Sequence, residues 1–551
     1  MALSRTLFLV LGLQFAFLFA PNAAKNVVCY FTNWAQYRPG LGAQLVKDID
    51  PQLCSHIVFA FAQLSGNKII GYEPTDDQTN GQWRQFTNLK SVNPNLKTLL
   101  AVGGYNHGST RFYSMASTQA GRAEFVQNAV TLCRYWGFDG LDLDWEYPGD
   151  SSNLDSFYFS ALIQELIEGF EKEAIVTNRA RLILSAAVPA GIEKASKGYN
   201  ITALDRYLDI VNIMAYDYHG LWESKTGLAS PLFSTDGQNF DVVCSATINW
   251  YLSSGLRPAK AHLGVVFFGR SWTLSSTGQT AVGSPAIGGG ASGAYTREPG
   301  ILSYYEICEK TRSLPYTIQT DVIGQVKYAY YDNSWITYED RDTLDIKMDF
   351  LLANNLGGAM VWSFDQDDFT GQFCGQTKYP LLGRVSSKIL KVPDSQTPTP
   401  TTMGTSTSTA VPTTAPPSTP TPTTAPPTTA PPTTATATTA PPTTAPPTTA
   451  PPTTATPTTA TPTMAVSSTS SPSTTTQAKI PSTNSPGVTP KSDTFVCPRI
   501  YGFFPDPKTC TSYYSCIMFT PIFVRCPVET MFNRSSTRCE SKSSTAFVCP
   551  L

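Results

Sequence analysis

The 551-residue sequence has few charged side chains and almost no imbalance between them. Only 15% of its residues are Asp, Glu, Lys or Arg, and the formal net charge is −2. This balance gives no electrostatic reason to expect nucleic acid or an anionic membrane as a partner. Glycine-rich phosphate loops of the Walker or Rossmann type are also missing. We therefore expect no nucleic-acid partner and no cofactor.

Long apolar segments are scarce too. The run Leu7–Ala20 contains Gln14 and falls short of the roughly 20 apolar residues that a membrane span needs. Arg5 precedes it and small residues follow it, which is the arrangement of a secretory signal peptide. We predict that residues 1–24 are removed and that the mature protein is secreted, extracellular and free of the membrane.

The twelve cysteines fall into two groups, six within the first 374 residues and six within the last 55. Outside the cell such cysteines form disulfides. Asn200-Ile-Thr and Asn533-Arg-Ser are glycosylation sequons, which a secreted protein can use where they are exposed.

A low-complexity segment separates the two groups. Residues 395–492 are almost wholly Thr, Pro, Ala and Ser, with the repeat Ala-Pro-Pro-Thr-Thr. With almost no large apolar residues the segment cannot offset the entropy cost of folding. We expect a disordered, mucin-like linker between a folded unit at 25–394 and a smaller one at 493–551.

The larger unit contains short β-type runs with helical stretches between them. Their alternation predicts an α/β fold with a parallel sheet, and eight runs favour a (β/α)8 TIM barrel over a doubly wound sheet. The gap between the last two runs is too long for one crossover helix, so an α+β subdomain is expected at about 268–358. The eight runs are Val27–Phe31, Ile57–Phe61, Thr98–Val102, Gly140–Glu146, Leu182–Val188, Ile210–Tyr216, Leu263–Phe267 and Ala359–Phe364.

The fourth run carries three carboxylates. Side chains alternate along a strand, so Asp142, Asp144 and Glu146 share one face and the apolar residues between them share the other. In a barrel the acidic face lines the lumen, with Glu146 at the C-terminal rim where barrel enzymes place their chemistry.

Three carboxyl groups this close cannot all ionise easily, so at least one pKa is raised. A carboxylic acid that stays protonated near neutral pH is the group that protonates a glycosidic oxygen. A Ca²⁺ loop is the alternative for an acidic cluster, but the large apolar neighbours and the missing EF-loop glycine argue against it. We expect no metal here.

The segment Asp139-Gly-Leu-Asp-Leu-Asp-Trp-Glu146 resembles the Asp-x-x-Asp-x-Asp-x-Glu signature of family 18 chitinases, and closely their animal members. The resemblance spans about residues 25–390. Further matching segments are Cys29–Gly40, Ser185–Gly191, Met214–Gly220 and Met360–Trp362.

The resemblance implies a retaining, substrate-assisted mechanism. Glu146 would protonate the glycosidic oxygen while the 2-acetamido oxygen of the substrate attacks C1. Asp144, which would share a hydrogen bond with Glu146 or with Asp142 at different stages, would stabilise the intermediate, and Tyr216 would donate to the acetamido oxygen.

The resemblance also implies which residues bind sugars. Trp362 would form the floor under the scissile sugar, and Trp34 and Trp222 would stack on neighbouring sugars. Two positions depart from the family pattern, since Tyr105 stands where Trp is usual and Phe268 where Tyr is usual. The implied sugar-binding residues are Tyr30, Trp34, Phe61, Tyr105, Tyr147, Met214, Asp217, Trp222, Arg270 and Trp362.

The same resemblance implies the disulfides Cys29–Cys54 and Cys308–Cys374. Cys133 and Cys244 are left over. Buried free thiols are the favoured account of this pair, and a third disulfide is the alternative.

The last 55 residues are too few to bury a large core, so a disulfide-rich β module is expected. A zinc site is disfavoured because the segment has no His and no Cys-x₂-Cys pair. Its cysteine pattern resembles the peritrophin-type chitin-binding module. That likeness implies the pairs Cys497–Cys516, Cys510–Cys549 and Cys526–Cys539, and stacking on chitin by some of Tyr501, Phe504, Tyr513, Tyr514 and Phe519.

The sequence therefore predicts a secreted, monomeric endo-chitinase that acts on chitin and chito-oligosaccharides, with a tethered binding module. Two alternatives stay open. One is a chitin-binding lectin or structural protein of a chitinous matrix, and the other is an enzyme acting on the chitobiose cores of N-glycans.

Overall fold

The structure is a computed structural model and describes residues 24–234, 242–392, 495–496, 501–517, 520–526, 530–533 and 538–541. The predicted signal peptide, except Ala24, and the whole predicted linker lie outside these residues. No helix in the described ranges is both long and apolar enough to cross a bilayer.

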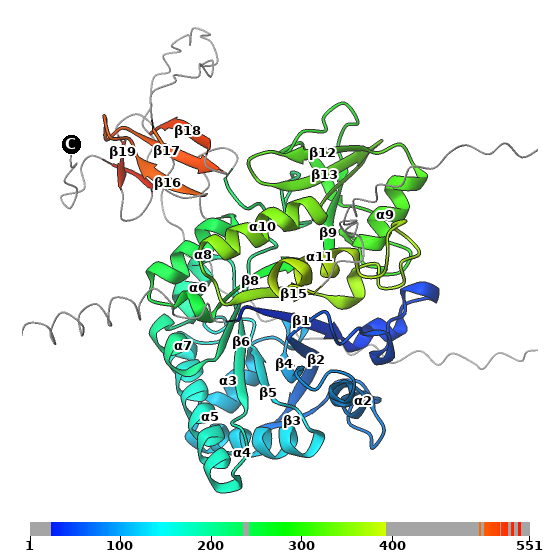
Figure 1. Cartoon of the computed structure of the whole chain (residues 1–551), viewed down its shortest axis with the longest axis vertical. Helices are drawn as coiled ribbons and strands as arrows, with labels where there is room; N and C mark the ends of the chain where they lie inside the picture. The colour runs from blue at the N-terminus through cyan, green and yellow to red at the C-terminus, as the bar shows by residue number, and fades with distance from the viewer. Residues whose placement is uncertain are drawn as a thin grey trace, which may run out of the picture. The chain divides into compact units, whose positions relative to one another are not determined.

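Eight parallel strands form a closed barrel, which confirms the predicted TIM-barrel fold (Figure 1). Closure comes from β1, which pairs with β15 through Cys29↔Val361 and with β2 through Cys29↔Ile57. Each predicted run forms one strand. The strands are β1 (Asn26–Thr32), β2 (His56–Ser65), β4 (Lys97–Gly103), β5 (Gly140–Asp144), β6 (Ile183–Pro189), β7 (Ile210–Met214), β8 (Ala261–Val266) and β15 (Gly358–Trp362).

Helices cover the outside of this ring (Figure 1). The start and end of α4 follow from local chemistry, because the Thr118 side chain accepts a bond from Gly121 N at 3.0 Å and Gly137 ends the helix at φ 85°. The helices are α2 (Gln82–Asn88), α3 (Thr110–Ala116), α4 (Gln119–Trp136), α5 (Asp155–Thr177), α6 (Ile192–Gly198), α7 (Ile201–Tyr207), α8 (Cys244–Ser253), α10 (Arg341–Ala353) and α11 (Pro380–Ile389).

Two apolar cores hold the barrel. The larger lies between the strands and the helices and contains residues such as Phe125, Leu141 and Val361. The smaller fills part of the lumen with residues such as Tyr30, Phe61 and Met360. The rest of the lumen is polar, and that polar part carries the chemistry described below.

The predicted insertion is present but shorter than expected. It is a six-stranded sheet with one helix and ends at Tyr338 rather than near 358. Residues 341–353 form α10, which packs on α11 and β15 and so belongs to the barrel. The inserted elements are β9 (Phe268–Leu274), β10 (Ala286–Gly289), β11 (Ile301–Ser303), α9 (Tyr304–Ser313), β12 (Thr317–Asp321), β13 (Val326–Tyr331) and β14 (Ser334–Tyr338). One further strand that the sequence did not predict, β3 (Lys68–Gly71), pairs antiparallel with β2.

The disulfides Cys29–Cys54 and Cys308–Cys374 are both present. Cys133 and Cys244 are buried free thiols, so the alternative of a third bond in the barrel is wrong.

The C-terminal module contains two small sheets. One consists of β16 (Tyr501–Pro505), β17 (Ser512–Ile517) and β18 (Thr520–Arg525), and the other of β19 (Thr530–Asn533) and β20 (Arg538–Ser541). Cys510 and Cys526 each take part in a disulfide bond. Since the side chains of the module's other four cysteines lie outside the described residues, the three pairs stay a prediction.

Candidate active site

The acidic strand has the predicted geometry. Asp142 and Asp144 face the lumen and are 0% and 3% exposed, while Leu141 and Leu143 pack into the outer core. Glu146 lies two residues beyond the end of β5 and is partly exposed at the C-terminal rim.

Asp142 is surrounded by hydrogen-bond donors from three other strands. Its Oδ2 accepts from Tyr30 Oη at 2.8 Å, and its Oδ1 accepts from Ser185 Oγ at 2.5 Å and from Asn212 Nδ2 at 3.5 Å. Burial raises the pKa of Asp142 to about 6, against the opposing effect of these bonds. Sequence reasoning missed Ser185 and Asn212, although each is a polar residue inside an apolar strand.

Asp144 has no comparable support. Among the described residues, none donates a hydrogen bond to its buried Oδ1. Burial, followed by the charges of Glu146 and Asp142, raises its pKa well above the ordinary value. Asp144 is therefore a carboxyl group that readily holds a proton or accepts a donor from a bound molecule.

Glu146 has the pKa of a general acid. Burial above all, together with the Asp217 charge, raises the pKa to about 7, although a hydrogen bond from Tyr147 and the Lys194 charge act in the opposite direction. A carboxyl group with this pKa is substantially protonated near neutral pH and can donate that proton.

A neutral tyrosine hydroxyl lies among the same carboxylates. Tyr216 follows β7 and is 9% exposed. Burial, then the charges of Asp144, Asp217, Glu146 and Asp142, raises its pKa well above its usual range, so the hydroxyl stays a donor. Its Oη approaches Met360 Sδ at 3.9 Å.

Beyond the C-terminal end of β7, Asp217 makes a two-point ion pair with Arg270 of β9, with Nε–Oδ1 at 2.7 Å and Nη2–Oδ2 at 2.6 Å. The Arg270 guanidinium also lies 5.3 Å from the Trp222 ring and 5.2 Å from the Phe268 ring. Met214 is the last residue of β7.

Aromatic side chains form the opposite wall. Trp362 lies 5.5 Å from Tyr30, 5.8 Å from Phe61 and 6.2 Å from Trp34 between ring centroids, and Trp34 is 37% exposed. Tyr105 stands apart from this wall and is 79% exposed.

Tyr147 is covered by a residue that the sequence did not single out. Lys194 Nζ, from α6, lies 4.6 Å from the centre of the Tyr147 ring and 3.3 Å from Asp150. The described residues contain no cluster of three or more His, Cys, Asp or Glu side chains arranged to hold a metal ion.

Residues 26–367 match the family model described as glycosyl hydrolases family 18. The chain belongs to this family. Residues 497–549 match the model for the chitin binding Peritrophin-A domain.

Individual family 18 proteins differ in activity. The chain is 41% identical over 387 residues to chitotriosidase-1 of Mus musculus, which covers 68% of this chain and 80% of the relative. It matches the crystal structure of an immunomodulatory active chitinase from Trichuris suis with a TM-score of 0.64 and 37% identity, over 66% of this chain and all of that one. It matches equally well a human pseudo-chitinase that retains chitooligosaccharide binding, with a TM-score of 0.63 and 37% identity over 66% and 99% of the chains. Family membership therefore leaves the activity to be argued from the site.

In the Peritrophin-A module the structure separates some of the candidate aromatic residues. Tyr513 is 4% exposed and stacks on Phe532 at 4.6 Å, so it belongs to the module's core. Tyr514 and Phe504 are half-buried. Phe523, which the sequence did not suggest, is 45% exposed and packs edge-on against Tyr514. The Tyr501 side chain and Phe519 lie outside the described residues.

Proposed function

We propose that this protein is a secreted, monomeric endo-chitinase that hydrolyses β-1,4-N-acetylglucosamine linkages with retention of configuration. The observation that carries the proposal is Glu146, a rim carboxyl group with a pKa of about 7 beside the buried Asp144. A protein that only binds sugar has no need to keep a protonated acid at this place.

The proposed first step is cleavage with the substrate's own nucleophile. Glu146 gives its proton to the glycosidic oxygen as the C1–O bond breaks. The 2-acetamido oxygen of the same sugar bonds to C1 and forms a positively charged oxazolinium ring. Asp144 accepts the acetamido N–H and stabilises this charge, while Tyr216 donates its hydroxyl to the acetamido oxygen.

In the second step a water molecule loses a proton to Glu146 and attacks C1, which reopens the ring. Two inversions at C1 give net retention. No second carboxylate is needed as nucleophile in this scheme. Asp217 is unsuited to act as a nucleophile in any case, because its ion pair with Arg270 directs both of its carboxylate oxygens toward the guanidinium.

Glu146→Gln tests the acid directly. Glutamine keeps the shape of the side chain but cannot donate the proton, so the turnover of chito-oligosaccharides should fall by roughly 10²–10⁴-fold. Binding should survive, and the first product of the wild type should be the β-anomer by NMR before mutarotation. Near-wild-type turnover by the variant, or an initial α-anomer, would contradict the mechanism.

The lectin alternative has a specific observation behind it, the likeness to a pseudo-chitinase with retained sugar binding. Wild-type protein that binds chito-oligosaccharides but releases no product from chitin would establish that alternative. Product from a high-mannose glycopeptide instead of chitin would favour the N-glycan alternative.

The C-terminal module supports the choice of an insoluble substrate. Its match to a chitin-binding model and the exposed ring of Phe523 fit a surface that stacks on sugar rings. We place the signal peptide at 1–24, the linker at 395–492 and glycans on Asn200 and Asn533. Asn200 is exposed, and its Oδ1 caps α7 at Ala203 N, which leaves Nδ2 for a glycan.

A further inference from the structure

Two of the tryptophans that are expected to bind sugar, Trp34 and Trp362, belong to segments far apart in the chain. Trp34 lies in a short 3-10 helix, η1 (Asn33–Tyr37), directly after β1, and Trp362 is the last residue of β15. Their ring centroids are 6.2 Å apart. Both rings are partly open to solvent, so packing alone holds only part of each.

A buried ion pair joins the same two segments behind the rings. Arg38, the residue after η1, places Nη1 2.5 Å from Asp365 Oδ2 and donates from Nη1 to the Asp365 carbonyl oxygen at 3.0 Å. Asp365 lies three residues after Trp362 and its side chain is 0% exposed, against 10% for Arg38. Ser363 Oγ donates to the other carboxylate oxygen, Oδ1, at 2.6 Å.

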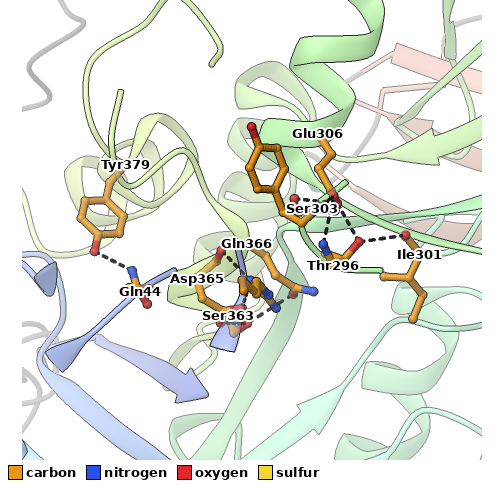
Figure 2. A network of polar contacts seen from close by, with 11 residues as sticks. Gln44, Thr296, Ile301, Ser303, Glu306, Ser363, Asp365, Gln366 and Tyr379 are labelled. Carbon is orange, nitrogen blue, oxygen red and sulfur yellow. Dashed lines mark hydrogen bonds and ion pairs between the residues drawn. The ribbon is translucent and has the colours of Figure 1, made fainter. Parts of the chain in front are cut away.

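Figure 2 shows Ser363, Asp365 and Gln366 gathered at this point. On one side Gln44 reaches Tyr379, with Nε2 donating to Oη at 3.0 Å, which ties the same two stretches of chain a second time. On the other side Glu306 gathers donors from Thr296 and Ser303 of the inserted subdomain.

Such a pair is not explained by stability alone. Desolvating two charges costs about as much as their attraction returns, and well-packed apolar residues often do as well. The guanidinium does tie the two segments together, because Arg38 Nη1 meets both the carboxylate and the backbone carbonyl oxygen of Asp365 and its nitrogens are held in a rigid plane.

We propose that Arg38 and Asp365 are positioning residues, which set Trp34 and Trp362 at the spacing that a chain of sugars requires. The proposal rests on the proposed function only in taking chito-oligosaccharides as ligands. Sugars long enough to touch both rings depend on this spacing, whereas sugars that touch Trp362 alone do not.

The test compares ligand lengths in a protein that cannot turn them over. In the full-length Glu146→Gln background, Arg38→Leu with Asp365→Leu removes both charges together and leaves neither ion unpaired. Calorimetric titration should show chitohexaose binding weakened about tenfold, the value of one well-placed aromatic contact. Chitotriose binding should change less than about twofold, and the C-terminal module contributes equally in each variant.

Two controls separate positioning from general damage. Arg122→Leu with Glu165→Leu removes a similar ion pair, N–O 2.7 Å, between α4 and α5 on the outer layer, and should leave both affinities unchanged. Tyr379→Phe removes the Gln44 tie on the same segments, together with the bond that Tyr379 Oη donates to the Asp48 carbonyl oxygen at 2.8 Å, and should have a smaller effect than the double leucine variant.

An unchanged ratio of chitohexaose to chitotriose affinity, whether both affinities hold or both fall together, would overturn the proposal. Should the double variant fail to fold, Arg38→Lys keeps the charge without the planar guanidinium that places Nη1 between the two Asp365 oxygens, and it must still lower the ratio. Since these are binding measurements, they stand or fall separately from hydrolysis, which the wild-type product assay reports.

Discussion

The raised pKa of Glu146 predicts that this proposed catalytic acid weakens the fold at neutral pH. The pKa is about 7 in the folded protein against an ordinary 4.5, so between these values the native state binds more protons than the unfolded chain. The free energy of unfolding must then decrease as pH rises through this window. A shift of one pKa unit corresponds to about 1.4 kcal/mol, so the shift of Glu146 sets an upper value of about 3–4 kcal/mol.

Glu146→Gln removes this penalty because glutamine cannot ionise. Since the side chain is partly exposed, water reduces the effect, and we expect the variant to gain about 1–3 kcal/mol over the wild type at pH 8 and almost nothing at pH 4. Asp144 adds to the gain, because the Glu146 charge that helps raise its pKa is gone. Urea denaturation of both proteins at a series of pH values measures the difference.

The matched control is Glu168→Gln, the same change at an exposed position on α5. Its difference from the wild type serves as the baseline at each pH. A difference for Glu146→Gln that does not vary with pH relative to this baseline, or a loss of stability at pH 8, would refute the account of Glu146 as a rim acid whose pKa is raised by partial burial.

Three further predictions concern the same molecule. Lys194→Met removes a positive charge that lowers the pKa of Glu146. The alkaline limb of the pH–kcat/KM profile should therefore move to higher pH, by about half a unit because Lys194 is exposed. A shift to lower pH would contradict this reasoning. Ser185→Ala removes the 2.5 Å hydrogen bond to Asp142 and should lower the free energy of unfolding by about 1.5–3 kcal/mol at pH 8. The loss should be smaller at pH 5, where Asp142 is mostly protonated. An equal loss at both pH values would argue against a charged Asp142. Truncation after residue 394 should leave the rate on soluble oligomers near that of the full chain. Activity on insoluble chitin should fall, most at low enzyme concentration, because the tethered binding module raises the local concentration of the catalytic unit at the polymer. Loss of activity on soluble oligomers would show that the predicted boundary is wrong.

The parts of the site that could be predicted from the sequence are local. Alternation along one strand was enough to send Asp142 and Asp144 into the lumen and Leu141 and Leu143 to the helices, because that periodicity does not depend on what the strand pairs with. The eight strands followed from apolar runs of the right length. The roles of Glu146 and Tyr216 came from the family resemblance rather than from any pattern of spacing.

The parts that could not be predicted depend on closure of the barrel. Asp142 receives donors from Tyr30, Ser185 and Asn212, on three different strands, and only their register brings the three together. Arg38 and Asp365 are 327 residues apart, and Lys194 reaches Tyr147 from α6, which follows the next strand of the barrel. The early end of the insertion was also hidden, since a helix of the barrel such as α10 has the same periodicity as a helix of the insertion.

The contrast between Asp142 on one hand and Asp144 and Glu146 on the other explains how one lumen serves both the fold and the proposed chemistry. Asp142 accepts hydrogen bonds from three donors, which stabilise its charged form and hold its side chain in place within the barrel. Asp144 Oδ1 has none among the described residues, and Glu146 has a hydrogen bond from Tyr147 that does not offset its burial. Among the described residues, the Oδ1 side of Asp144 thus has no donor, and the proposed mechanism assigns the acetamido N–H of the substrate to it. Filling that side with protein donors would make the barrel more stable and lower both pKa values, and the acid would then lose its proton at neutral pH.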